Sequence, residues 1–189
     1  MPYDLTGKTV AILATDGFER SELAEPLKAL QEAGATVHIV APGADPIKSW
    51  DKTDWGDTFP VDRSLEDIGS FAEYDALVLP GGQINPDTLR VEPRAVAFVK
   101  GMVRAKKPIA AICHGPWLLV EAGVVEGLRM TSYPSIRTDL RNAGATVVDE
   151  EVVCDQGIVT SRNPDDLPAF CAKLIEEIAE GRHEDRMVA

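Results

Sequence analysis

The chain has 189 residues, of which 44% are hydrophobic and 26% are charged, and its formal net charge is −12. This length and composition are typical of one globular domain with a full hydrophobic core, so we expect a single domain over residues 1–189. The acidic balance excludes nucleic acids and anionic membranes as expected partners, because both require clustered Lys and Arg.

The first half of the chain is typical of a β-α-β unit followed by a long insertion. Residues 8–14 form a short apolar run that predicts a buried strand. A helix follows, which Ser21 is expected to cap and Gly34 to end, and residues 35–40 predict the second strand. Residues 43–67 are too long for an ordinary connection. We therefore expect this insertion to cover part of the molecule or to bind a neighbour.

Strands and helices alternate again through the second half. The predicted strands are residues 75–79, 108–112, 147–148, 152–153 and 158–159, and the predicted helices are residues 92–104, 117–123, 135–142 and 165–180. This alternation implies parallel strands joined by right-handed crossovers. The predicted fold class is α/β, a layered sandwich around a doubly wound, mainly parallel sheet, with residues 182–189 as a peripheral tail.

The segment Ala111–Pro116 is the most informative part of the chain, because an apolar strand delivers Cys113 and His114 into a Gly-Pro turn. A thiol at a strand-to-helix corner is expected to be exposed, and nearby helix amides stabilise a thiolate. Cys113 is therefore the candidate nucleophile. The alternative is a buried, inert cysteine at the end of a core strand, an interpretation that Cys154 and Cys171 fit.

Acidic residues follow the first predicted strand, and they are expected to lie near Cys113 because parallel strands end at one edge of a sheet. These residues are Glu19 and Glu22. A glutamic acid beside a thiolate keeps its proton and donates a hydrogen bond to the sulfur, which lowers the pKa of the thiol. The alternative is that both acids are at a helix N-terminus because its dipole favours them.

Glycines follow the strand at residues 75–79 and allow the backbone to approach a ligand closely. These are Gly81 and Gly82, and the amides of Gly82 and His114 are a candidate oxyanion hole. The alternative for the glycines is an ordinary tight turn. Adjacent strand residues point to opposite faces, so His114 can reach the sulfur only if the chain turns sharply at this point. The alternative role for His114 is to stabilise the turn by hydrogen bonding.

Four motifs together resemble the ThiJ/PfpI family of the class I glutamine amidotransferase-like superfamily, which includes the parkinsonism-associated deglycase. They are Ala111–Pro116, Leu79-Pro80-Gly81-Gly82, Gly17-Phe18-Glu19-x-x-Glu22 and Thr131-Ser132-Tyr133-Pro134. The segments 85–90 and 50–56 are most similar to the PfpI-type intracellular peptidases and bacterial general stress proteins. The resemblance covers residues 8–178 and implies a flavodoxin-like three-layer fold with a nucleophile elbow at Cys113.

The resemblance also implies a stress-related cysteine hydrolase that forms a dimer or a hexamer. In this branch an acid from a neighbouring subunit completes a triad with the Cys and His of the elbow, and Asp87 occupies the position of that acid. Glu22 matches the acid that contacts the nucleophile, Gly82 the oxyanion-hole glycine and Tyr133 a pocket tyrosine. The substrates that the resemblance implies are peptide bonds, glycated amines or thiols, and small aldehydes such as methylglyoxal.

Alternatives to catalytic turnover remain open at this point. Cys113 oxidised to a sulfenic or sulfinic acid would make the protein a redox sensor, and family analogy also allows a chaperone-like role. An odd number of cysteines without CxxC spacing predicts reduced thiols, and widely separated histidines predict neither a metal site nor a cofactor. A cytoplasmic location is expected, because no basic-apolar leader or run of roughly 20 apolar residues is present.

Overall fold

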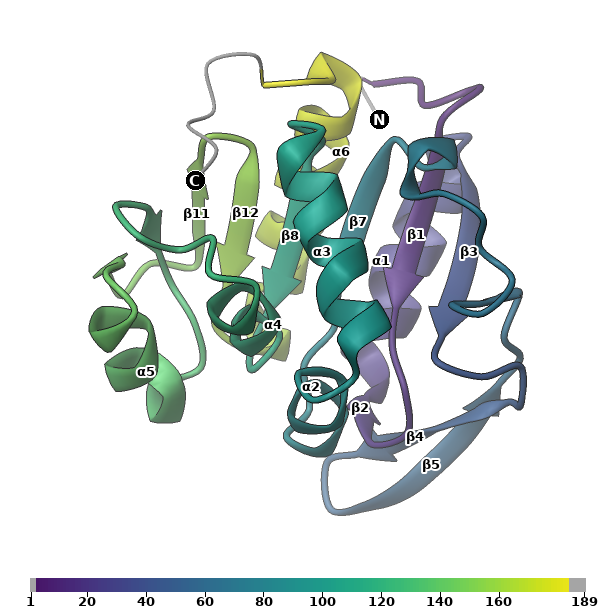
Figure 1. Cartoon of the computed structure of the whole chain (residues 1–189), viewed down its shortest axis with the longest axis horizontal. Coiled ribbons are helices and arrows are strands. Elements are labelled where there is room, and N and C mark those ends of the chain that lie inside the picture. The colour runs from purple at the N-terminus through teal and green to yellow at the C-terminus, as the bar shows by residue number, and fades with distance from the viewer. Residues whose placement is uncertain (1–2, 184–189) are drawn as a thin grey trace.

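Seven strands form the central sheet, and the computed structural model describes residues 3–183 of the chain (Figure 1). In spatial order the strands are β11 (Val152–Asp155), β12 (Ile158–Ser161), β8 (Ile109–Ile112), β7 (Ala76–Leu79), β1 (Thr9–Leu13), β3 (Thr36–Ala41) and β6 (Arg63–Ser64). Neighbouring strands are parallel except β11, which pairs antiparallel with β12. The predicted mainly parallel α/β sheet is therefore confirmed.

Helices cover both faces of this sheet and complete the expected three-layer, flavodoxin-like sandwich. In Figure 1, α3 (Pro93–Arg104) and α4 (Pro116–Glu121) lie in front of the sheet, and α1 (Arg20–Glu32) and α6 (Leu167–Glu180) lie behind it. Each face has its own buried hydrophobic cluster, with Phe98 in the front cluster and Phe170 in the rear one. Within residues 3–183, every helix falls short of the length and hydrophobicity that spanning a bilayer requires.

The smaller elements lie around the edges of the sandwich. They are the helices α2 (Ile84–Leu89) and α5 (Arg137–Asn142), the 3₁₀ turns η1 (Phe71–Glu73), η2 (Pro134–Ile136) and η3 (Pro164–Asp166), and the strands β9 (Arg129–Met130) and β10 (Thr146–Val147). The predicted polar helix at residues 135–142 corresponds to η2 and α5. The helix α2 was not predicted, because Pro86 and its short length hide its periodicity.

The long insertion folds as a β-hairpin beside the corner that follows β1. Its strands β4 (Ile47–Asp51) and β5 (Asp54–Phe59) are antiparallel, and β4 pairs in parallel with β2 (Phe18–Glu19). The rings of Trp50 and Trp55 meet edge to face at 5.6 Å. The sequence did not predict these strands, because β5 is largely exposed and lacks the apolar alternation of a half-buried strand.

The start of α1 differs from the prediction, and its end agrees with it. Glu19 is the N-cap residue and Ser21 lies inside the helix, where its hydroxyl donates to Glu19 Oε1 at 3.3 Å. Ser21 is therefore not the cap. Gly34, with a φ of +93°, follows the last turn in the left-handed conformation that ends many helices.

Asn85 ties two corners of the sheet together. The residue is fully buried, and its Nδ2 donates to Pro80 O at 3.0 Å and to Gly81 O at 3.1 Å. Its Oδ1 accepts a hydrogen bond from Thr15 N at 2.8 Å. One side-chain amide thus joins the corner after β7 to the corner after β1, both of which end at the carboxyl edge of the sheet.

Replacement of Asn85 by alanine is expected to lower the free energy of unfolding by about 3 kcal/mol, because it removes the partners of one buried amide and two carbonyls. Urea unfolding followed by circular dichroism measures the change. Gln83→Ala, at an exposed position next to α2, is the matched control and should change stability by less than about 0.5 kcal/mol. Equal losses in the two variants would contradict the role assigned to Asn85.

Candidate active site

The segment between β8 and α4 forms the sharp elbow that the sequence predicts. Cys113 has a φ of +63°, in the left-handed region that few residues other than glycine adopt. Gly115 N donates to Ile112 O at 2.8 Å, and a Cβ on Gly115 would lie only 2.4 Å from Leu79 O. The turn therefore requires glycine at position 115, and it sets Cys113 at the carboxyl edge of the sheet.

The thiol of Cys113 is buried, so the expectation of an exposed thiol is wrong. The residue is only 6% exposed, and its carbonyl accepts a hydrogen bond from Tyr133 N at 2.9 Å. Burial raises the pKa of Cys113, and a negative charge on the nearby Glu22 raises it further, whereas the N–H groups of Gly82 and His114 oppose the rise. The resting thiol is consequently protonated, in contrast to the thiolate expected from the sequence.

Glu22 lies against the Cys113 side chain, as the sequence predicts. It is fully buried on α1, and its Oε2 accepts a hydrogen bond from Gly81 N at 2.8 Å. Burial raises the pKa of Glu22 to about 8, although the contacts with Gly81 and Cys113 act in the opposite direction. The carboxyl therefore keeps its proton at neutral pH and can donate it to the sulfur.

His114 reaches the sulfur despite its position next to Cys113 in the sequence. Its Nδ1 lies 3.2 Å from Cys113 Sγ, and its Nε2 lies 3.1 Å from Ser135 Oγ. The ring stacks on Tyr133 with centroids 4.7 Å apart and meets Trp117 edge on at 5.2 Å. Burial lowers the pKa of His114, which favours the neutral imidazole.

Ser135 is the site residue that the sequence analysis missed. A neutral imidazole that donates from Nε2 to Ser135 Oγ leaves its Nδ1 lone pair free to accept the thiol proton of Cys113. The hydroxyl of Ser135 can therefore accommodate the tautomer of His114 that acts as a base. Its place directly after the Thr131–Pro134 motif was the only signal in the sequence.

Asp87 and Glu19 lie outside the contacts of the thiol. Asp87 is exposed on α2, and within residues 3–183 its carboxylate makes no hydrogen bond or ion pair. Glu19 is at the N-cap position of α1, where its side chain makes no capping hydrogen bond, and its negative charge contributes to the raised pKa of Glu22. One chain therefore brings together the predicted Cys113, His114 and Glu22 with Gly82, but it does not bring Asp87 to His114.

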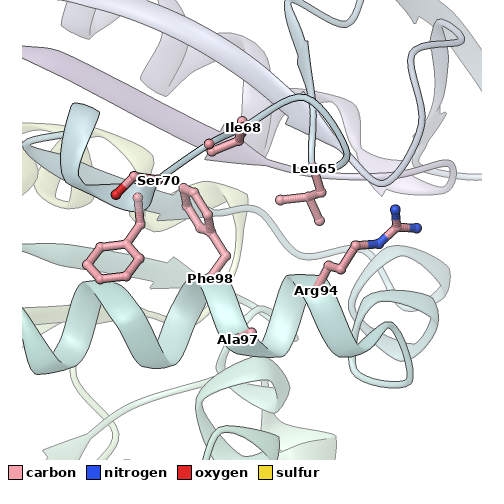
Figure 2. Close-up of a pocket in the computed structure, with 8 residues that line it drawn as sticks. Leu65, Ile68, Ser70, Arg94, Ala97 and Phe98 are labelled. Carbon is pink, nitrogen blue, oxygen red and sulfur yellow. The ribbon is translucent and has the colours of Figure 1, made fainter.

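A pocket lies away from this site, between α3 and the segment that leads into η1. Figure 2 shows Leu65, Ile68 and Phe98 around it, with Arg94 at one end. Its volume is about 290 Å³, and its walls are mainly apolar. Arg94 is already paired with Glu66 at 2.7 Å. None of the predicted site residues lines this pocket.

Comparisons with known proteins find relatives over most of the chain. The DJ-1/PfpI family matches residues 8–177. General stress protein 18 of Bacillus subtilis (strain 168) is 46% identical over 169 residues, which cover 87% of this chain and 94% of that protein. Protein/nucleic acid deglycase 2 of Escherichia coli (strain K12) is 43% identical over 164 residues, covering 86% and 93%. The crystal structure of Drosophila melanogaster DJ-1beta has a TM-score of 0.82 and 29% identity, covering 91% and 90%.

The buried Glu22 carboxyl predicts a specific dependence of stability on pH. Its pKa of about 8 lies above the ordinary value of 4.5, so the folded protein holds a proton that the unfolded chain releases. Stability from this group is complete below pH 4.5 and is lost as pH rises towards about 8, by up to about 1.4 kcal/mol per pH unit.

Unfolding of the wild type and of Glu22→Gln between these pH values measures this loss. As pH rises, the free energy of unfolding of the wild type should fall relative to that of Glu22→Gln. Glu25→Gln, which removes a carboxyl at an exposed position on the same helix, is the control and should change stability by less than about 0.5 kcal/mol. A difference between the wild type and Glu22→Gln that does not change with pH would show that Glu22 is ionised throughout.

Proposed function

Because the chain belongs to the DJ-1/PfpI family, we propose that it is a cysteine-dependent hydrolase with Cys113 as its nucleophile. One observation carries the proposal: Cys113 Sγ lies 3.2 Å from His114 Nδ1 and also contacts the buried carboxyl of Glu22. Among the described residues, Cys154 and Cys171 have no histidine partner. The relative named as a deglycase supports this class of activity.

The proposed reaction begins when the thiol adds to a substrate carbonyl carbon. The thiol proton passes to His114 Nδ1, and the carbonyl electron pair moves onto its oxygen. The N–H groups of Gly82 and His114, which point to the sulfur in the resting site, then stabilise the negative oxygen. Protonated Glu22 donates to the sulfur as its charge develops, which offsets the cost of burying a thiolate.

The second half of the reaction restores the thiol. With methylglyoxal, His114 first gives its proton to the negative oxygen, so that the adduct is a thiohemiacetal. Through an enediol, the C–H proton of the former aldehyde carbon then moves to the neighbouring keto oxygen and the hydroxyl proton moves to the keto carbon, which gives a lactoyl thioester. Water, which gives a proton to His114, attacks the thioester carbon, the bond to Cys113 breaks, and the sulfur recovers that proton. The net change is the addition of one water to methylglyoxal to give lactate. An amine or thiol adduct first loses its amine or thiol, which takes a proton from His114, and so releases the aldehyde.

The burial of Cys113 favours a small substrate over a folded protein. A thiol that is 6% exposed admits a compact carbonyl group more readily than an extended peptide backbone. We therefore propose small reactive aldehydes such as methylglyoxal, or their adducts with amines and thiols, as the substrate class. The deglycase name of the Escherichia coli relative supports this choice, and the burial of Cys113 favours it over a peptidase activity.

We also propose that the protein self-associates through α2. Asp87 lies on this helix between two exposed apolar side chains, Ile84 with 44% and Val91 with 78% of its surface exposed. Burial of these side chains against a second copy would bring Asp87 towards another protomer. The Asp87 carboxylate of that copy would then compete with Ser135 for His114 Nε2.

Replacement of Cys113 by serine tests the assignment of the nucleophile. Methylglyoxal consumption and cleavage of a fluorogenic peptide are measured for the wild type and the variant. We expect kcat/KM for methylglyoxal to fall by about 10³-fold or more in Cys113→Ser. Cys154→Ser and Cys171→Ser are matched controls and should retain wild-type turnover. Full activity in Cys113→Ser, or faster turnover of the peptide than of methylglyoxal by the wild type, would contradict the proposal.

Replacement of Ser135 by alanine tests whether this residue orients His114. We expect kcat to fall about tenfold with little change in KM, a fraction of the roughly 10²- to 10⁴-fold that acid–base catalysis supplies. Ser135→Thr keeps a hydroxyl and should recover most of the rate. The ¹⁵N shifts of His114 should report one tautomer in the wild type and a mixture in Ser135→Ala. Normal rates in Ser135→Ala together with a loss in Asp87→Asn would assign the orienting role to Asp87.

A further inference from the structure

A cluster of ligand-type side chains lies at the C-terminal end of α6, where the sequence analysis expected no metal. We propose that Glu177, Glu180 and His183 bind a divalent transition-metal ion such as Zn²⁺. Their donor atoms all lie within 4.8 Å of one another. The end of α6 lies at the edge of the sheet opposite the Cys113 elbow (Figure 1), so this site is independent of the proposed hydrolase activity.

The buried carboxylate of Glu177 points into the cluster, where each of its oxygens faces a nitrogen. Its side chain is 3% exposed, and its Oε1 is paired with Lys173 Nζ at 2.7 Å. Its Oε2 lies 2.8 Å from His183 Nε2, the distance of an ion pair, although among the described residues neither atom makes a hydrogen bond of good geometry. Two ligand atoms on a tetrahedral Zn²⁺ with bonds of about 2.0–2.2 Å lie roughly 3.4 Å apart, so these two atoms would separate by about half an ångström to hold the ion.

His183 is held in place by contacts beyond the cluster. Its backbone N–H donates to Lys106 O at 3.0 Å. Its ring packs on Gly157 in the β11–β12 turn, where a Cβ would lie 2.1 Å from the ring. Gly181, with a φ of +89°, ends α6 and redirects the chain so that His183 returns to Glu177. The imidazole is therefore positioned before any ion binds, which lowers the entropic cost of binding.

The charge and chemistry of the donors favour a transition metal over Mg²⁺. Lys173 pairs with both Glu176 and Glu177, and Glu180 adds a third carboxylate to the same end of α6, so a divalent ion would bind where carboxylates gather. Lys173 also fixes Glu177 through Oε1 and leaves Oε2 as the coordinating atom. An imidazole together with carboxylates suits Zn²⁺, whereas Mg²⁺ prefers oxygen ligands alone. The bound ion would fasten the segment after α6 to the β11–β12 turn.

Zinc titration of EDTA-treated protein tests the site. The Cys113→Ser protein serves as the parent, so that the elbow thiol does not compete for the ion. Isothermal titration with ZnCl₂ should give one site per chain, and zinc should raise the thermal unfolding temperature, whereas MgCl₂ at the same concentration should not. Glu180→Gln and His183→Gln should each weaken zinc binding by at least about tenfold, since even loss of an outer-shell partner costs roughly 10- to 100-fold.

Glu176→Gln is the matched control for charge, because it removes the same negative charge from α6 at a residue outside the cluster. Its zinc affinity should stay within about twofold of the parent, below the loss expected for any metal ligand. Equal affinities in the parent, Glu180→Gln and His183→Gln would overturn the proposal. The same conclusion would follow if zinc left the unfolding temperature of the parent unchanged, and the Glu177–His183 contact would then be an ion pair only.

Discussion

The candidate site depends on the close packing of backbone corners at the carboxyl edge of the sheet. A Cβ on Gly81 would lie 2.5 Å from Glu22 Oε2 and 2.6 Å from Cys113 Cβ, so a larger residue would push the acid and the thiol apart. The buried amide of Asn85 holds the same corner to the one after β1. The contact between Glu22 and Cys113 therefore requires that residue 81 has no side chain and that the side chain of Asn85 is present.

Burial gives this site its chemical character. The same low-polarity surroundings raise the pKa of Cys113, raise that of Glu22 to about 8 and lower that of His114, so all three groups are neutral at rest. A neutral site costs less to bury than a thiolate with an imidazolium. Charge then develops only when a substrate carbonyl accepts the thiol, where the N–H groups and the Glu22 proton are already positioned to receive it.

Most of the sheet and the identity of the central residues could be predicted from the sequence. Apolar runs marked the core strands, and the parallel topology then placed the corners carrying Glu22, Gly82 and Cys113 at one edge. The sequence did not predict the β4–β5 hairpin, because the hairpin is held by the pairing of β4 with β2 and has no apolar pattern of its own. Ser135 escaped because its role depends on where the imidazole of His114 points, which local sequence does not specify.

The sequence by itself determined the α/β class, the elbow at Cys113 and the acid beside it, since periodicity and turn residues are local properties of the chain. Only the tertiary structure decided that the thiol is buried, that His114 Nε2 lies against Ser135, and that one chain leaves Asp87 apart from His114. The turn at Gly181 likewise brings His183 to Glu177, beyond the helix that carries the acid. These features are set by side-chain directions and long-range packing, which sequence spacing does not encode.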